Sequence, residues 1–461
     1  MCLVFVSLAA AVALAFPVAA QSSDAAWLAP QPQRDRSIAI GGPSFRAPVM
    51  LTPPPNAVPA AFLLFLNSVS CTELGNCVAV GLYTDTTGSL QPMIITEIDG
   101  VWTQGVEATL PANAATAPST QSAELISVTC TRAGNCVAVG DYTDTNGYAQ
   151  GLIITEKHGV WGQGVELDQP ANAATSNQFL FLNDITCISA GNCTATGAYV
   201  DKTGNYQGLV VSETGGLWAE GLEVTLPANA APNPLAGPHN PAAGVVSMGL
   251  VSCLSQGNCV AGGQYTDTNY NSQPMITTES NGVWAPAVEL ALPANASTAE
   301  ASQNGFLANL KCFSRGNCTI GGGYNDASGN AQPMVINLSH GVYRPAFELT
   351  LPANAATAPG TQSAYLNGLT CTSLGNCLAY SAYNDLNGNG EPLVITETRG
   401  VWAQGIEPPL PADAATAAGA QNANIEGMSC TRPGVCVAVG QYTDDSGFQQ
   451  PIAYTTVPVG P

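Results

Sequence analysis

Short stretches of alternating apolar and polar residues recur along the chain, and turns rich in Gly, Asn and Asp separate them. Residues 66–71 and 77–83 alternate in the manner of β-strands, with Gly75 and Asn76 in the turn between them. Residues 93–96 predict a third strand and residues 101–110 a fourth. We therefore expect this unit to be four antiparallel strands.

The unit occurs seven times, and each copy contains two cysteines separated by five residues. The first cysteines of successive copies lie 59, 57, 66, 59, 59 and 59 residues apart. A fixed period of this size indicates a solenoid, a propeller or an array. Four antiparallel strands followed by a longer link describe a propeller blade, and a connector of about a dozen residues explains why the period exceeds that of the common propeller repeats.

The two ends of the chain complement each other. The seventh unit stops after its third strand, near residues 452–456, whereas residues 45–57 match residues 102–114 without a gap. The N-terminal segment is therefore predicted to supply the missing fourth strand, which closes the ring and covers its edges. The predicted fold is all-β: one seven-bladed β-propeller with four antiparallel strands per blade, formed by residues 45–461.

The chain begins with features of an export signal. An apolar run over residues 3–16 is followed by Pro17 and by Val18-Ala19-Ala20, which predicts a signal peptide over residues 1–20, although no Lys or Arg follows Met1. Residues 21–44 form a Pro-rich segment that precedes the ring. No other stretch is long and apolar enough to span a bilayer, so membrane insertion is not expected.

Apart from Cys2 in the predicted leader, all fourteen cysteines belong to the repeated pairs. Even numbers at regular spacing in an exported chain favour disulfides over zinc, and the three histidines are too few to complete seven zinc sites. A bridge over so short a loop pins one hairpin and contributes about 2 kcal/mol. These bonds predict a secreted protein, extracellular or periplasmic. The predicted pairs are Cys71/Cys77, Cys130/Cys136, Cys187/Cys193, Cys253/Cys259, Cys312/Cys318, Cys371/Cys377 and Cys430/Cys436.

The net charge of −21 opposes binding to nucleic acid or to an anionic membrane. The sequence contains no Ser-His-Asp arrangement, Gly-rich phosphate loop or metal-ligand cluster, and we expect no cofactor. An extracellular glycan or a protein surface is the expected partner, and the protein is expected to be a monomer.

Four residue types recur in the units, and each has a structural interpretation. An Asp eight residues after the second cysteine, such as Asp85, predicts an Asx-turn, with a cation-attracting ring of carboxylates as the alternative. Trp102 and its equivalents predict packing between blades, with sugar binding as the alternative. Gly81 and its equivalents predict close backbone approach between blades. Glu97 and its equivalents are interpreted as edge or turn charges.

Residues that break the repeat are the candidates for function. The connector after the third unit carries about seven extra residues, including His239, and is expected on the face that carries the Asp turns. Tyrosines occur in the turns of blades two, three and four, where they can stack on sugars or contact a protein, or are surface residues without a role. Asp141 and Glu391 are off-pattern carboxylates whose pairing as acid and base is a hypothesis. The candidate binding residues are Tyr148, Tyr206, His239, Tyr270, Asp144, Asp201 and Asp267.

The repeat V-S/T-C…G-N-C-V-A-V-G-x-Y-T-D…Q-P-M/L-I-I-T-E…G-V-W resembles repeats of exported bacterial proteins that are taken to be seven-bladed β-propellers. The resemblance covers residues 45–456 and implies an architecture but no activity. Sialidases are also propellers, but their repeated Asp-box is absent. Sialidases also need three arginines clustered at the centre of the ring. Here Arg132, Arg315 and Arg432 lie in the loops between paired cysteines, which argues against a sialidase.

The sequence therefore predicts a secreted, disulfide-stabilised binding module for an extracellular glycan or protein. The alternatives are an extracellular polysaccharide-active enzyme, either a glycoside hydrolase or a lyase, and a structural protein of the cell envelope.

Overall fold

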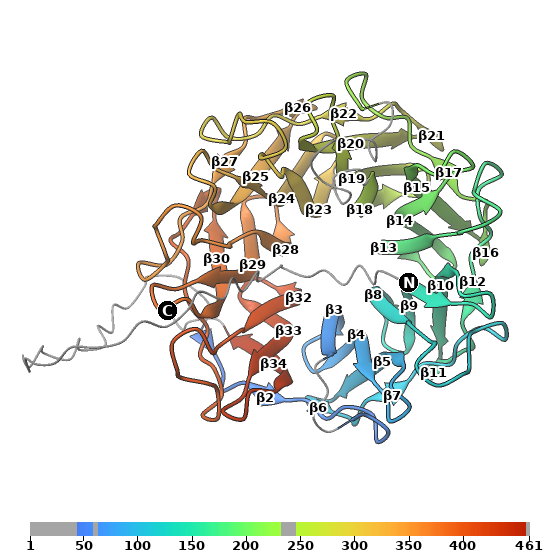
Figure 1. The fold of residues 1–461 in the computed structure, drawn as a ribbon, viewed down its shortest axis with the longest axis horizontal. Helices are drawn as coiled ribbons and strands as arrows, with labels where there is room; N and C mark the ends of the chain where they lie inside the picture. The colour runs from blue at the N-terminus through green and yellow to red at the C-terminus, as the bar shows by residue number, and fades with distance from the viewer. Residues whose placement is uncertain (1–43, 59–62, 232–245, 458–461) are drawn as a thin grey trace, which may run out of the picture.

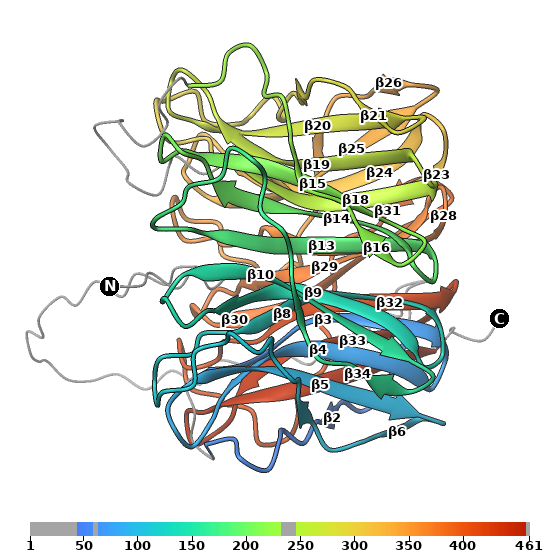
Figure 2. The same ribbon diagram turned by 90° about the vertical axis from the view of Figure 1, so that its right-hand side faces the viewer.

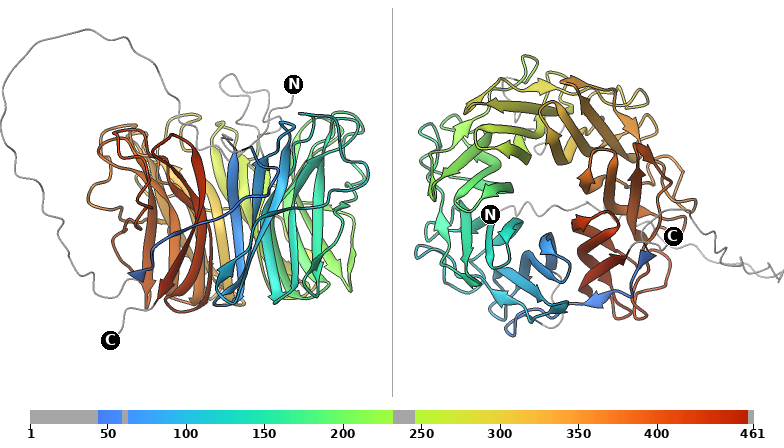
Figure 3. Two further views of the ribbon diagram at one scale, coloured as in Figure 1. Left: turned by 90° about the horizontal axis from the view of Figure 1, so that it is seen from below. Right: turned by 180° about the vertical axis from the view of Figure 1, so that it is seen from behind.

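The computed structural model describes residues 44–58, 63–231 and 246–457, and these form a ring of seven antiparallel sheets (Figure 1). The predicted fold class is confirmed. Seen from the side, the strands run between the two faces of the ring (Figure 2), and the blades are arranged around one axis (Figure 3). Within these residues no helix is long and apolar enough to cross a membrane. The predicted signal peptide, all but the last residue of the Pro-rich segment, and His239 lie outside the described residues.

The first strand of every blade is the innermost one, and the second, third and fourth follow outward (Figure 1). The first strands are β3 (Leu64–Glu73), β8 (Glu124–Arg132), β13 (Leu180–Ser189), β18 (Ser247–Ser255), β23 (Phe306–Ser314), β28 (Leu366–Ser373) and β32 (Asn424–Arg432). The second strands are β4 (Asn76–Thr84), β9 (Asn135–Thr143), β14 (Asn192–Val200), β19 (Asn258–Thr266), β24 (Asn317–Asn325), β29 (Asn376–Asn384) and β33 (Val435–Thr443). The third strands are β5 (Leu90–Ile98), β10 (Ala149–Lys157), β15 (Tyr206–Thr214), β20 (Ser272–Ser280), β25 (Ala331–Ser339), β30 (Gly390–Thr398) and β34 (Gln449–Val457).

The fourth strand is broken into two short pieces in most blades, where the sequence predicted one continuous strand over residues 101–110. The pieces are β6 (Val101–Trp102) and β7 (Val106–Glu107), β11 (Val160–Trp161) and β12 (Val165–Glu166), β16 (Leu217–Trp218) and β17 (Leu222–Glu223), β21 (Val283–Trp284) and β22 (Val288–Glu289), β26 (Val342–Tyr343) and β27 (Phe347–Glu348), and β31 (Val401–Trp402). The outermost position leaves this strand with one neighbour only, so its pairing is easily interrupted.

The N-terminus closes the ring as predicted. Strands β1 (Ser44–Phe45) and β2 (Val49–Met50) pair antiparallel with β34, with Phe45 opposite Thr456 and Val49 opposite Ala453. The seventh blade is thus built from both ends of the chain, and the outer edge of β34 is covered.

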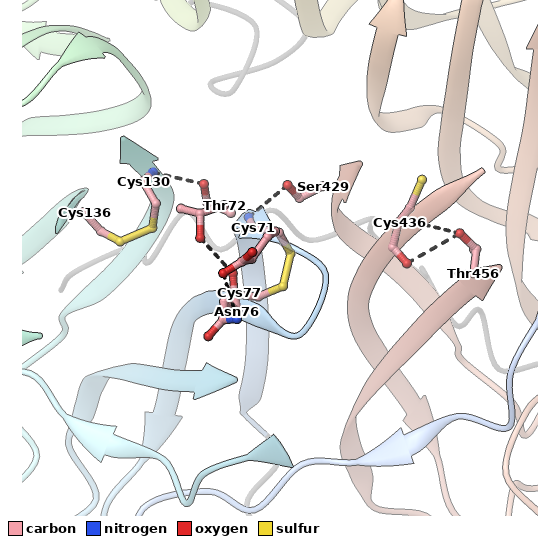
Figure 4. Close-up of a disulfide and its surroundings, with 11 residues drawn as sticks. Cys71, Thr72, Asn76, Cys77, Cys130, Cys136, Ser429, Cys436 and Thr456 are labelled. Atoms are coloured by element: carbon pink, nitrogen blue, oxygen red, sulfur yellow. Dashed lines mark hydrogen bonds between the residues drawn. A yellow bond between two sulfur atoms is a disulfide. The ribbon is translucent and has the colours of Figure 1, made fainter. Parts of the chain in front are cut away.

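All seven disulfides form as predicted, each across the hairpin of the first two strands. They indicate an oxidising environment for the folded protein. Neighbouring blades are joined at the same level by hydroxyls: the Ser429 Oγ accepts a hydrogen bond from the Cys71 N–H at 3.0 Å (Figure 4), and Ser70 does the same for Cys130.

The two cysteines of a pair differ in burial. The second cysteine, on the second strand of its blade, is buried in every blade and packs into the core between blades, so its role is structural and it offers no exposed surface for a ligand. These buried residues are Cys77, Cys136, Cys193, Cys259, Cys318, Cys377 and Cys436. The first cysteine is partly exposed in five blades, and Cys312 and Cys371 are the buried exceptions.

The two faces of the ring differ. The Gly100 N–H donates a hydrogen bond to the Gly75 carbonyl oxygen at 2.9 Å. The turns between third and fourth strands therefore lie beside the cystine hairpins, on the face of the ring that we call the cystine face. On the opposite, connector face, the blade-to-blade connectors pair with the Asp turns, as Ala114 does with Asp144. The expected common face for connectors and Asp turns is therefore confirmed.

The core lies between blades. One cluster joins Val437 and Val439 of blade seven to Leu66 and Ala79 of blade one, and Trp102 packs against it. The other fourth-strand aromatics occupy equivalent clusters, which confirms the packing interpretation of these residues.

Two sequence interpretations were wrong. The backbone that approaches Gly81 belongs to its own blade and not to a neighbouring one. A Cβ at Gly81 would lie 1.9 Å from Phe65 O, where β3 bulges between Leu66 and Ser68. Glu97 is 6% exposed rather than an edge charge, because it lies opposite Trp102 and shares its buried side of the sheet. The equivalent glutamates are also buried: Glu156, Glu213, Glu279 and Glu397.

Candidate functional site

The Asp turns of the connector face are hydrogen-bonded Asx-turns. Asp201 Oδ1 accepts the N–H groups of Thr203 and Asn205 at 2.8 and 3.0 Å, while its Oδ2 accepts the Gln207 amide at 2.8 Å. Burial alone would raise the pKa of Asp201, but these bonds and that of the Thr203 hydroxyl hold the pKa below its usual value. Asp144 and Asp267 make the same backbone and Gln contacts. The Asp carboxylates therefore shape the turns that a ligand on this face would meet.

The three candidate tyrosines occupy different positions in their turns. Tyr148 is four residues after its Asp and Tyr206 is five, whereas Tyr270 is three after its Asp, with φ 57°, where other blades have Gly. Each is partly exposed. The tyrosines therefore do not form a repeated row.

Two of the tyrosines gather around Phe179 in the connector between blades two and three. Ala149, next to Tyr148, pairs with Phe179, and the ring of Phe179 contacts the ring of Tyr206 edge-on at 5.5 Å between centroids. Phe179 also contacts Phe181 at 5.2 Å. The structure thus brings Tyr148 and Tyr206 to one region, but no contact joins Tyr270 to them among the described residues.

Sequence reasoning missed the aromatic residues at the start of the innermost strands, where Tyr365 comes directly before β28. Phe65, Phe181, Phe306 and Tyr365 each lie six residues before the first cysteine of their blade, at the connector-face end, and all are partly exposed. Phe306 and Tyr365 form a second edge-on pair at 5.0 Å. Counting back from each cysteine would have found them.

In blade two this position is Glu124, and Asp141 lies directly opposite it on β9. Burial raises the pKa of Glu124 to about 7, and the Asn67 amide, 3.5 Å from its Oε2, offsets part of the effect. Burial, followed by the charge of Glu124, raises the pKa of Asp141 well above its usual range. Burial and mutual repulsion therefore favour the protonated form of one of these carboxyl groups, which can donate a hydrogen bond beside the acceptor oxygens of the other. We call Glu124, Asp141, Phe179, Phe181 and Tyr206 the blade 2–3 cluster.

Two further half-buried carboxyl groups lie on the innermost strands. Asp184 accepts the Val251 N–H at 2.8 Å and the Ser127 hydroxyl at 2.9 Å, and burial, opposed by these bonds, raises its pKa to about 6. Burial raises the pKa of Glu426 to about 7. Asp184 links blades two, three and four at the ring's inner wall, so its contacts are explained by the fold.

The off-pattern residues Asp141 and Glu391 are not brought together. Glu391 lies on β30 of blade six, and burial, followed by the charges of Glu407 and Asp385, raises its pKa to about 7. Asp141 has Glu124 as its partner instead, which the spacing in the sequence did not reveal. Across the described ranges no group of three or more His, Cys, Asp or Glu side chains is arranged to hold a metal ion.

No family model and no curated protein matches the chain. Solved structures with a similar fold include a protein of unknown function from Dyadobacter fermentans, at 10% identity and TM-score 0.47 over 91% of this chain and 100% of that one. A polysaccharide lyase described as an ulvan lyase is 10% identical, with TM-score 0.47, over 90% of this chain and 94% of that one. A Hadza microbial sialidase is 9% identical, with TM-score 0.42, over 74% of this chain and 65% of that one. Similarities this remote say nothing about ligand or activity.

Proposed function

We propose that the chain is an exported, monomeric binding module that binds an extracellular glycan on its connector face, at the blade 2–3 cluster. The observation that carries the proposal is the position of three partly exposed aromatic rings next to a pair of carboxyl groups. Glu124 and Phe181 occupy the same position on the innermost strands of adjacent blades, so the acids lie at the same level of the ring as the aromatic rings, one blade away.

This combination suits a sugar. An aromatic face binds the apolar side of a pyranose ring, while carboxyl groups hydrogen-bond its hydroxyls and fix its orientation. The net charge of −21 and the acids of the cluster favour neutral or basic glycans over polyanions. Tyr148 extends the surface at blade two, and the turns of Asp144, Asp201 and Asp267, with Tyr270 and His239, are proposed to contact a longer glycan.

A glycan array probed with the purified protein tests the proposal. We expect Phe181→Ala and Tyr206→Ala to weaken binding to the selected glycan by about tenfold or more, because each removes one stacking surface. Phe347→Ala is the matched control: this ring is 37% exposed on the outer wall, and its loss should leave binding unchanged. Equal effects of all three substitutions, or no glycan bound by the wild type, would overturn the proposal.

The paired carboxyl groups of Glu124 and Asp141 favour a second candidate, an enzyme that cleaves polysaccharide. A carboxyl group that stays protonated near neutral pH can act as a general acid, and its ionised neighbour can act as a base. The glycans that bind should then be assayed for cleavage. Loss of turnover with retained binding in Glu124→Gln and Asp141→Asn supports the enzyme, whereas binding without any turnover in the wild type leaves the binding module.

A further inference from the structure

A cavity of about 300 Å³ opens between blades three and four, towards the cystine face. Its lining includes Thr194 and Ser212 from blade three and Cys253, Glu279 and Trp284 from blade four. Its volume is at the lower end of the range for small-molecule sites. It lies on the face opposite the blade 2–3 cluster and is unrelated to the glycan proposal.

Glu279 provides an unpaired acceptor in this cavity. The side chain is 8% exposed, and its Oε2 has no hydrogen-bond partner. Glu279 pairs directly with Trp284, so both side chains project from the same side of the sheet, and Trp284 packs in the cluster between blades three and four. Glu279 therefore faces blade three. Glu213 also borders the cavity, but the equivalent alternation turns it towards blade two, where the charge of Lys157 acts on it.

The walls of the cavity depart from the repeat at two positions. Ser212 replaces the Thr found in five other blades, and Thr194 replaces the Val of four. Ser212 is smaller than the usual residue, and Thr194 adds a hydroxyl whose partner is the Cys259 sulfur at 3.7 Å. Blade three thus lacks the methyl group of the Thr at one position and has a hydroxyl in place of a Val methyl group at the other, which blade five shares through Thr319.

We propose that this cavity binds a small ligand carrying a primary ammonium group, which Glu279 anchors against the face of Trp284. A buried carboxyl oxygen without a partner can accept a hydrogen bond from a ligand, and an ammonium group supplies both donors and the opposite charge. Trp284 adds attraction for a cation over its ring. The hydroxyls of Thr194 and Ser212 accept the remaining N–H groups or bind a hydroxyl on the ligand.

Binding of such a ligand favours the ionised form of Glu279. Burial raises the pKa of Glu279, and Glu213 and Glu220 are the other titratable groups that border the cavity, with Arg315 reaching the neighbouring Ser280 at 3.5 Å. An ammonium ion favours the ionised carboxylate, so it binds more weakly at any pH at which Glu279 is protonated in the free protein. Affinity should therefore increase with pH while Glu279 titrates in the free protein.

Titration calorimetry with ethanolamine, and with ethylene glycol as its uncharged counterpart, tests the proposal. We expect ethanolamine to bind the wild-type protein in the millimolar range, and to bind more tightly as the pH rises through the titration of Glu279. Ethylene glycol should bind at least about tenfold more weakly, because it lacks the charge. Absence of ethanolamine binding, or equal binding of both compounds, overturns the proposal.

Two variants locate the site. Glu279→Gln should weaken ethanolamine binding by about tenfold or more, whereas Glu397→Gln, at the equivalent position of blade six, should change it by less than about twofold. The double variant Thr194→Val with Ser212→Thr introduces the residues common in other blades and keeps Glu279. It should fold as the wild type does but should no longer bind ethanolamine. Unchanged binding in Glu279→Gln, or equal losses in Glu279→Gln and Glu397→Gln, contradicts the assignment.

Discussion

The Tyr442 hydroxyl lies 3.1 Å from Oδ1 of Asp413, and this pair replaces a three-residue arrangement that the other six blades share. In blade one, the Tyr83 hydroxyl lies 2.6 Å from Glu107 Oε2, and the Asn56 amide donates to the same oxygen at 2.8 Å. Blade seven has Met50 in place of that Glu and Asp413 in place of that Asn. In blade seven the carboxylate comes from the connector instead of the outer strand, so the Tyr442 hydroxyl still has a charged acceptor.

This exchange predicts that Asp413→Asn lowers the free energy of unfolding by about 1–2 kcal/mol, because Tyr442 loses its charged acceptor. Adding Met50→Glu to Asp413→Asn recreates the arrangement of the other blades and should recover most of the loss. Urea unfolding of the two variants measures both effects. Equal stability of the single and double variants would show that the arrangement is not transferable between blades.

The buried glutamates predict a protein that is more stable in mild acid than in base. Glu397 is 5% exposed, its Oε2 has no partner, and burial raises its pKa above the ordinary value of 4.5. A carboxyl group whose pKa is raised in the folded state stabilises the fold while it is protonated. Its full contribution is present below the ordinary pKa of 4.5 and is lost as the pH rises through the folded-state pKa. Glu97, Glu156, Glu213 and Glu279 add the same dependence.

Glu397→Gln should therefore raise stability at about pH 8 and leave it nearly unchanged at about pH 4. The urea midpoints of the wild type and the variant, compared at both pH values, measure this. Blade five provides a natural precedent, because Leu338 takes the glutamate position there and Tyr343 takes the Trp position. A variant that is less stable than the wild type at the higher pH would show that the Glu397 carboxylate has a stabilising partner.

Glu391 predicts a similar gain in blade six for a different reason. Six blades have Gln at this position, and in blade one the Gln91 amide donates to Asp85 at 3.0 Å. In blade six the Asn387 and Asn389 amides contact Asp385 instead, and Glu391 has a pKa of about 7 because of burial and its acidic neighbours.

Glu391→Gln removes a like charge and supplies the missing amide donor. We expect it to stabilise the protein by about 1 kcal/mol above pH 7, a value reduced by solvent screening of this half-buried group, and to have little effect at about pH 4. Thermal unfolding across this pH range measures the difference. A gain of the same size at every pH would assign it to the hydrogen bond alone.

The blade count, the disulfides and the closure of the ring were predictable because each depends on a local signal. A cystine across a hairpin requires only two cysteines and a turn, and the match of residues 45–57 to residues 102–114 identifies the closing strand without any long-range contact. The burial of Glu97 was not predictable in this way, because it depends on the register that places it opposite Trp102.

The pairing of Glu124 with Asp141 in the candidate site depends on an irregularity in one strand. Glu124 lies six residues before Cys130, whereas Asp141 lies five residues after Cys136. In a regular hairpin they would not be opposite each other, but the bulge between Leu125 and Ser127 adds one residue to β8 and aligns them. The sequence marked Asp141 as unusual, and only the register supplied its partner.

The equivalent bulge of blade one, between Leu66 and Ser68 in β3, leaves little room for a side chain at Gly81, although blade six has Ser381 at the same position. A Cβ at this position would lie 1.9 Å from Phe65 O and 2.8 Å from Phe65 C, and both are main-chain atoms that belong to the ladder. We expect Gly81→Ala to destabilise the protein by about 2–4 kcal/mol, since either the bulge or the strand pairing must shift. Gly162→Ala is the control: this exposed glycine has one atom within 4 Å of the added carbon, at 3.4 Å, and blade three has Ala219 at the same position. Urea unfolding should separate the two variants, and equal stabilities would mean that β3 can move away from β4 at little cost.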